Sequence, residues 1–228
     1  MIITVILIII LIFSAILHEY AHGWMARRLG DDTAEREGRL TLNPLKHLDP
    51  IGSIVVPLLL VITKAPFFIA WAKPVPYNPY NLRDKKYGEL KVAAAGPLTS
   101  FALAIIFGLL ARFLVLPTGN KAQLALNLLS GANDAALSLT SGSLVASLTL
   151  LALLACLINL VLGIFNLIPI PPLDGSKILM AFLPERAKTF FYQIERYSFI
   201  ILILLITSGF FSFVYTAAVW GFILLTGL

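Results

Sequence analysis

Long apolar runs constrain the fold of this sequence more than any other feature. A helix needs about 20 mainly apolar residues to cross the hydrocarbon core of a bilayer. Runs of about this length cover residues 2–29, 92–116, 143–168 and 198–226. Only 13% of the residues are charged, against about 25% in soluble globular domains. The sequence therefore predicts an all-α polytopic membrane protein in which residues 1–228 form a single integral membrane domain.

The predicted number of transmembrane helices is four to five, because the last run allows two interpretations. Ser208-Gly209 weakens residues 198–226 near the middle, so they form either one long helix or a broken pair. A further apolar stretch at about residues 51–72 is interrupted by two prolines and a lysine. We expect it to enter and leave the membrane on one side as a re-entrant hairpin that lines a protein cavity.

Residues 38–42 are the one short stretch that suggests a strand. Apolar and polar side chains alternate in Gly38-Arg39-Leu40-Thr41-Leu42, which is typical of a half-buried strand. Because the stretch lies between two apolar runs, we expect a short membrane-associated β element there.

Lys and Arg gather between the apolar runs. Of the 17 such residues, five lie in 27–46, five in 73–91 and four in 177–196. Cytoplasmic loops of membrane proteins carry an excess of Lys and Arg. We therefore expect a multi-pass protein of the cell membrane with these three segments in the cytoplasm and the N-terminus outside. The net charge of +5 is explained in the same way, and no nucleic-acid partner is expected.

The first apolar run ends in the motif His18-Glu19-x-x-His22. Residues four apart share one face of a helix, so both imidazoles can bind one zinc ion, with Glu19 placed to take a proton from a zinc-bound water. Two His and a Glu can also decorate any wet helix face. Residues 2–17 carry no charge, however, and an ionisable group at the bilayer centre costs about 2.5–3.5 kcal/mol. The metal interpretation is favoured, at a site nearer the cytoplasmic face because Arg27 follows closely.

A catalytic zinc site needs three protein ligands and an open fourth position. Asp174 is the best candidate for the third ligand, because its segment reaches the same membrane face and the prolines before it let the carboxylate turn inward. Taken alone, it could be an ordinary Asp-Gly turn. His47 lies in a loop, where a structural role is the simpler interpretation. Asn166 could donate a hydrogen bond to a developing oxyanion, and Asn159, two turns earlier, is the alternative.

These residues resemble the site-2 protease family of intramembrane zinc metalloproteases. The matching pieces, in the order of the family, are His18-Glu19-x-x-His22, Gly96-Pro97 and Asn166 through Asp174-Gly175. Residues 38–50 are similar to a compact prokaryotic branch that has no PDZ or CBS domain. Ser176 stands where many relatives have a second glycine after the aspartate.

The resemblance implies a three-helix catalytic core and one zinc ion per chain. It implies that His18, His22 and Asp174 bind the zinc ion and that Glu19 is the general base. It also supports Asn166 as a contact to the substrate or the transition state.

The expected activity is hydrolysis of peptide bonds within or near transmembrane helices, as in regulated intramembrane proteolysis. Suitable substrates are membrane proteins in the lipid bilayer, such as an anti-sigma factor or a signal-peptide remnant. The residues 38–42 and 51–72 are candidates for holding an unwound substrate segment by backbone pairing. The alternatives are a metal-ion transporter, because intramembrane His and Asp often line ion routes, and a non-catalytic metal-binding membrane protein. A transporter would not require Glu19.

Overall fold

The structure is a computed structural model that describes residues 2–49, 55, 62, 73–114, 116 and 118–228. The described residues are helical or irregular and include no strand. The α-helices are α1 (Ile2–Arg28), α2 (Thr33–Arg36), α4 (Gly88–Phe113), α5 (Thr118–Leu129), α6 (Asn133–Ser138), α7 (Leu144–Asn166), α8 (Asp174–Met180), α9 (Glu185–Glu195), α10 (Ser198–Thr207) and α11 (Phe210–Thr226). Short 3-10 turns form η1 (Pro44–Lys46) and η3 (Pro79–Asn81). The re-entrant hairpin expected over residues 51–72 lies outside the described residues, of which only 55 and 62 fall in that range.

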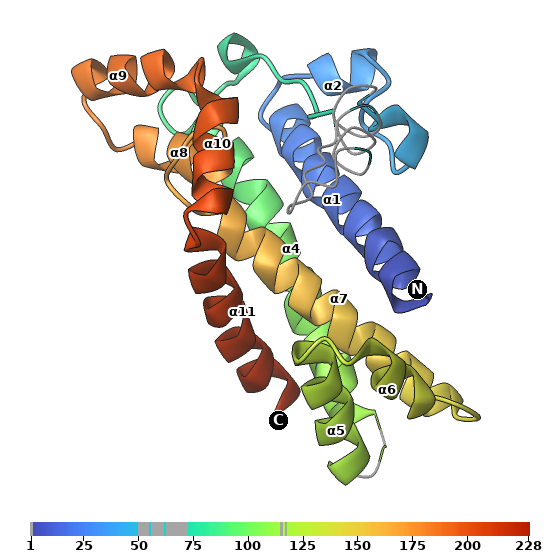
Figure 1. The fold of residues 1–228 in the computed structure, drawn as a ribbon. Coiled ribbons are helices and arrows are strands. Elements are labelled where there is room, and N and C mark those ends of the chain that lie inside the picture. Colours follow the sequence, from blue (N-terminus) through green and yellow to red (C-terminus); the bar gives the residue numbers. More distant parts are fainter. Residues whose placement is uncertain (1, 50–54, 56–61, 63–72, 115, 117) are drawn as a thin grey trace.

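Three helices, α1, α4 and α7, are long and apolar enough to cross a membrane. α4 contacts α1 and α7, and α1 also contacts α7, so the three form one packed group (Figure 1). α11 packs on α7 and α4 and completes the bundle. The all-helical prediction is confirmed for the described residues, and the group of three long helices is what positions the site described below.

The ends of the first helix follow from its sequence. α1 ends at Arg28, and Gly30 follows with a φ of 106°. The Asp31 N–H then donates to the Ala26 carbonyl at 2.9 Å, which is the bond pattern of a helix that ends at a left-handed glycine. The prediction of a helix over residues 2–29 is therefore confirmed to within one residue.

The second long helix begins earlier than predicted. α4 starts at Gly88, not at residue 92, and its first turn contains the charged residues Glu89 and Lys91. The Asp84 carboxylate accepts from the Tyr87 N–H at 2.9 Å and pairs with Lys91 at 2.6 Å. Polar residues in the first turn of a helix do not extend an apolar run, so the predicted start of α4 was too late.

The last apolar run is a broken pair of helices. α10 ends at Thr207, Gly209 adopts a φ of 79°, and α11 begins at Phe210. A left-handed residue cannot continue a right-handed helix, and glycine adopts this conformation without steric cost. Of the two interpretations of residues 198–226, the broken pair is the one observed.

The segment expected to form a β element is irregular. Residues 38–42 form a turn and bends, with Gly38 at a φ of 62°. The Arg39 N–H donates to the Ala34 carbonyl at 2.8 Å, so its backbone closes the end of α2. Alternation over five residues was therefore not sufficient to specify a strand, and the β element is not found among the described residues.

Small side chains let the three long helices approach closely. Ala93, Ala104 and Ala111 of α4 are buried, and a Cβ added to Gly108 would lie 3.1 Å from the sulfur of Cys156 on α7. Such small residues at helix contacts are typical of membrane bundles, where close van der Waals packing holds helices together. The Asn159 side chain also donates to the Ser14 hydroxyl at 2.9 Å, which ties α7 to α1.

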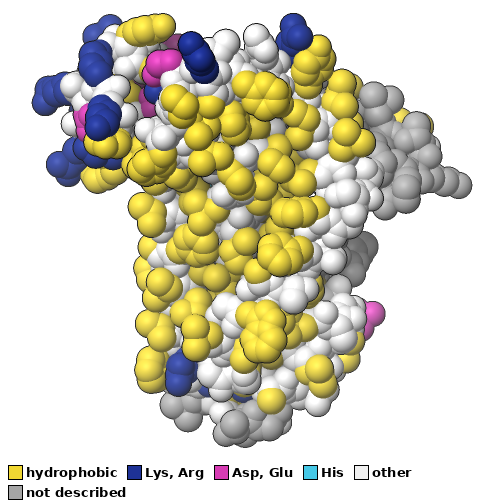
Figure 2. Space-filling model, turned by 90° about the vertical axis from the view of Figure 1, so that its left-hand side faces the viewer, with side chains coloured by type: hydrophobic (Ala, Val, Ile, Leu, Met, Phe, Trp, Pro, Cys, Tyr) yellow, Lys and Arg dark blue, Asp and Glu magenta, His cyan; other side chains and the backbone are white. Residues whose placement is uncertain are grey.

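The surface agrees with a membrane environment. Apolar side chains cover the flank of the molecule, while most of the visible Lys and Arg side chains gather at one end (Figure 2). This surface, together with the three long apolar helices, indicates a membrane protein.

Candidate metal centre

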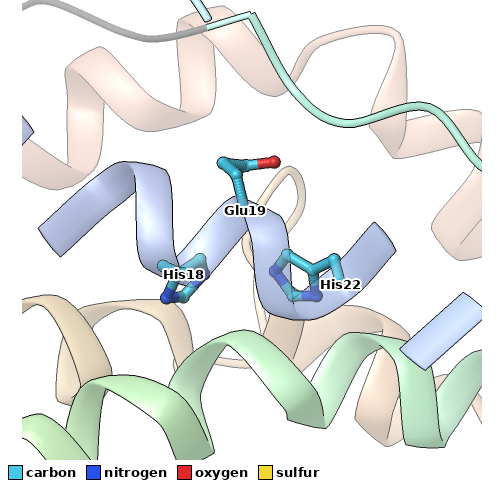
Figure 3. Close-up of side chains that lie close together, drawn as sticks. All are labelled: His18, Glu19 and His22. Carbon is cyan, nitrogen blue, oxygen red and sulfur yellow. The ribbon is translucent and has the colours of Figure 1, made fainter. Parts of the chain in front are cut away.

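One turn of α1 carries the three residues of the motif. The ligand atoms of His18, Glu19 and His22 all lie within 4.8 Å of one another. The two imidazole rings meet edge to face, with their centroids 4.8 Å apart. Figure 3 shows both rings on the side of α1 that faces α4, with Glu19 on the other side of the helix turn. The two histidines therefore share a face, while the glutamate lies beside it.

Asp174 joins the histidines from the other end of the sequence. Its Oδ2 atom lies 3.0 Å from His18 Nε2 and 3.3 Å from His22 Nε2. α7 ends at Asn166, and the proline-rich residues 167–173 lead to α8, whose first residue is Asp174. The chain turns back tightly here: a Cβ on Gly175 would overlap the carbonyl of Leu167. The prolines and Gly175 together direct the carboxylate towards α1.

Outer contacts orient both histidines. His22 Nδ1 donates to the Val92 carbonyl at 2.7 Å, and His18 Nδ1 lies 3.0 Å from the Ser100 hydroxyl. Because a carbonyl can only accept a hydrogen bond, Nδ1 of His22 carries the proton. In the neutral ring, Nε2 of His22 therefore has a free lone pair. Such second contacts are what metal-binding histidines almost always make.

The donor set fits a zinc ion. In the neutral ring, His22 Nε2 and Asp174 Oδ2 are both acceptors 3.3 Å apart, and a bound cation would satisfy both lone pairs. Two imidazole nitrogens and one carboxylate oxygen are the ligand types of catalytic zinc sites, which keep a further position open. The three residues predicted as zinc ligands are therefore brought together by the fold in a geometry suited to that metal.

Gly96 of α4 makes room for the ligand atoms. A Cβ at this position would lie 2.5 Å from His18 Nε2 and closer still to His22 Nε2. No real Cβ makes such contacts, so any side chain would displace the imidazoles. Gly96, the first residue of the Gly96-Pro97 pair that contributed to the family resemblance, thus packs directly against the two histidine rings.

A cavity of about 140 Å³ opens beside these residues. Its lining consists of His18, Glu19, His22, Pro74, Val75, Tyr77, Val92, Ala93, Asn166, Pro172, Asp174 and Lys177. All five residues of the predicted site, His18, Glu19, His22, Asn166 and Asp174, therefore border one cavity.

The predicted asparagine lines the cavity, and its alternative does not. Asn166 is part of the lining, with its amide donating to the Leu162 carbonyl at 2.9 Å. Asn159 is 1% exposed and bonds Ser14, which supports a structural role. His47 is also absent from the lining; it is 2% exposed and donates to the Thr41 carbonyl at 2.7 Å.

Lys177 and Tyr77 line the cavity and were missed by sequence reasoning. The Lys177 ammonium lies 5.3 Å from the centroid of the Tyr77 ring, within reach of a cation–π interaction. Burial alone would lower the pKa of Lys177, but Tyr77 and Asp174 hold it above its usual value, so this side chain is cationic. Lys177 follows Asp174 by one helical turn, which could have suggested it; Tyr77 carries no comparable signal.

Residues 79–209 match peptidase family M50. The chain is also similar to three named relatives along most of its length. The first is YwhC of Bacillus subtilis, which its name classes as a zinc metalloprotease: it is 36% identical over 208 residues, or 91% of this chain and 83% of the relative. The second is Rip2 of Mycolicibacterium smegmatis, classed in the same way, with 28% identity over 92% of this chain and 70% of the relative.

The third relative is the zinc metalloprotease MJ0392 of Methanocaldococcus jannaschii, with 28% identity over 79% of this chain and 35% of the relative. No solved structure matches the chain significantly. The family match covers more than half of the chain and includes Asp174, and the YwhC similarity extends over most of both proteins. The chain therefore belongs to peptidase family M50, the site-2 protease family, and is a zinc metalloprotease.

Proposed function

We propose that residues 1–228 form one integral membrane protease domain that hydrolyses peptide bonds within or near transmembrane helices of other membrane proteins. The observation that carries this proposal is the meeting of Asp174 with His18 and His22 beside Glu19, at a site built on the long apolar helix α1. Membership of a membrane protease family implies membrane-embedded substrates and a lipid environment. Anti-sigma factors and signal-peptide remnants are suitable substrates.

Each residue of the site has a proposed task. His18, His22 and Asp174 would hold one zinc ion, whose bound form would supply Lewis-acid activation of water and of the scissile carbonyl. Glu19 accepts a proton from the attacking water and later delivers it to the nitrogen of the leaving amine. Asn166 donates a hydrogen bond to the carbonyl oxygen as negative charge develops there. Its amide is bound to the Leu162 carbonyl in this structure, so this role requires the side chain to rotate.

The variant Glu19→Gln tests the proposal. Glutamine has the same shape but cannot accept the proton, so cleavage of a transmembrane test peptide should fall about 10²–10⁴-fold. The zinc content should stay at one ion per chain, because Glu19 is not among the proposed ligands. Glu35→Gln is the matched control: Glu35 lies in α2, is half exposed and pairs with Arg27, and its loss should leave cleavage unchanged.

The same pair of measurements separates protease from transporter. Family membership does not favour a transporter, and zinc transport would persist without a general base. If Glu19→Gln cleaved as fast as the wild type, Glu19 would not be the general base. If the wild type carried zinc into vesicles but cleaved no peptide, the transporter would be the better explanation.

We further propose a multi-pass arrangement in the cell membrane with the N-terminus outside and the active site nearer the cytoplasmic face. The support is the Lys and Arg content of residues 27–46, 73–91 and 177–196, which favours the cytoplasm for these segments. In this arrangement the turn before α7 lies outside the cell and α9 lies inside it.

Single cysteines test this orientation. The buried Cys156 is first replaced by serine, and then Ser141→Cys or Thr189→Cys is added at an exposed position. In intact cells a membrane-impermeant maleimide should label the cysteine at 141 and should label that at 189 only after lysis. The reverse pattern would invert the proposed topology, whereas the site chemistry would be unaffected.

A further inference from the structure

The segment that follows residue 72 supplies a single backbone donor to the active site. It reads Lys73-Pro74-Val75-Pro76 and has no regular secondary structure. Proline has no N–H, so Val75 carries the only backbone donor between Pro74 and Pro76. That N–H donates to Oε2 of Glu19 at 2.9 Å. The donor reaches across 56 residues of sequence to the proposed general base.

Buried charged groups fasten this segment on both sides. The guanidinium of Arg39, 8% exposed, donates to the carbonyls of Lys73 at 2.8 Å and Pro74 at 3.2 Å. Asp31 is fully buried and accepts from the Asn78 N–H at 2.7 Å and from the Asn81 side chain at 2.9 Å. Hydrogen bonds to charged groups are about twice as strong as neutral ones. The backbone around Val75 is thus held at two places.

The Val75 side chain packs on α1 and fixes the distance between this segment and the helix. Val75 is 6% exposed, and a Cβ on Gly23 would lie 2.7 Å from its Cγ1 atom. Gly23 lies one helical turn after Glu19, so the valine rests on the same face of α1 from which the carboxylate extends. The side chain and the amide of one residue therefore engage two neighbouring positions of the helix.

We propose that the main-chain N–H of Val75 is a positioning group for Glu19. It holds one carboxylate oxygen and leaves the other to receive the proton of the attacking water. A glutamate side chain has several rotamers. If the hydrogen bond fixes one of them before the reaction, the entropy cost of choosing that rotamer no longer adds to the activation free energy. The inference rests on the proposed role of Glu19 as the general base. If the contact served only to fasten the loop, its loss would affect folding or substrate binding, not turnover.

The test removes this N–H from the full-length protein. Val75→Pro does so by mutation, and replacement of Val75 by its α-hydroxy analogue does so while keeping the valine side chain. Both changes should lower kcat for a transmembrane test peptide about 10–100-fold, the range expected for a misplaced catalytic group. KM and zinc content should remain close to wild type. Val75→Ala keeps the N–H and should lower kcat less than either change.

A double variant shows whether the effect passes through Glu19. In the Glu19→Gln background the α-hydroxy replacement should cause no further loss of the residual rate, because groups that act as a unit are not additive. Tyr80→Ala, in the same loop and 87% exposed, should retain the wild-type kcat and serves as control.

Three results would overturn the inference. The first is a wild-type kcat for the α-hydroxy protein. The second is a rise in KM or a loss of zinc in place of the fall in kcat. The third is that the α-hydroxy replacement lowers kcat by the same factor in the wild type and in the Glu19→Gln protein. None of these would affect the proposed function as long as Glu19→Gln lowers cleavage to the expected extent. Conversely, a wild-type protein that cleaves no transmembrane peptide would remove the proposed function itself.

Discussion

Purified Asp174→Ala is expected to contain essentially no zinc and to cleave no test peptide. Asp174 Oδ2 lies 3.0 Å and 3.3 Å from the two histidine Nε2 atoms, so the substitution removes one of three proposed ligands. Two histidines alone do not complete a catalytic zinc site. The loss should exceed the 10–100-fold reduction in metal affinity that typically follows loss of an outer contact. Metal analysis of the protein after dialysis measures the zinc content directly.

The control for this prediction is Asp134→Ala. Asp134 is exposed in the first turn of α6, in a part of the fold remote from α8 (Figure 1). It should keep one zinc ion per chain and full cleavage. Zinc retained at the wild-type level by Asp174→Ala would show that the third ligand lies elsewhere, and the assignment of the carboxylate would then be abandoned.

Gly96→Ala is expected to reduce zinc binding almost as strongly, although it changes no proposed ligand. The added methyl group would lie 2.5 Å from His18 Nε2 and closer to His22 Nε2, so both imidazoles must turn away from their present positions. Alanine is favoured over glycine inside a helix by about 1 kcal/mol, so the local helix should not be weakened. Zinc affinity and cleavage should therefore fall together while the circular dichroism spectrum is retained.

Gly221→Ala is the matched control for the change at Gly96. Gly221 also lies inside an apolar helix, but the three atoms nearest to a Cβ there all belong to the flexible side chain of Leu160, the closest at 3.3 Å. This variant should bind zinc and cleave like the wild type. If Gly96→Ala also bound zinc and cleaved like the wild type, the two imidazoles could not lie against Gly96 when zinc is bound.

Much of the helical framework was readable from the sequence, because it depends on local composition. The apolar runs predicted α1, α4 and α7 to within a few residues, and the charged residues in the first turn of α4 account for the late predicted start of that helix. The prediction was poorest where the choice of conformation is not local. The alternation in residues 38–42 suggested a strand, but an isolated strand has no partner for its backbone, and the arginine in it binds residues 73 and 74 instead.

The sequence by itself determined which chemistry is possible. The spacing of His18 and His22 follows from the helical period alone, and it places both imidazoles on one face of α1 whatever surrounds them. The proline-rich approach to Asp174 likewise signals a carboxylate that leaves the course of its helix. These are properties of covalent geometry and short-range sterics, so they are visible without a fold.

Only the tertiary structure decided how those groups are held. The Val92 carbonyl that orients His22, the space left by Gly96, the Lys177–Tyr77 pair and the Val75 N–H bound to Glu19 all join segments distant in sequence. Two of these contacts use backbone atoms, which every residue possesses and no sequence pattern marks. Their positions depend on how closely α1 and α4 pack and on where buried Arg39 and Asp31 fasten the loop between those helices.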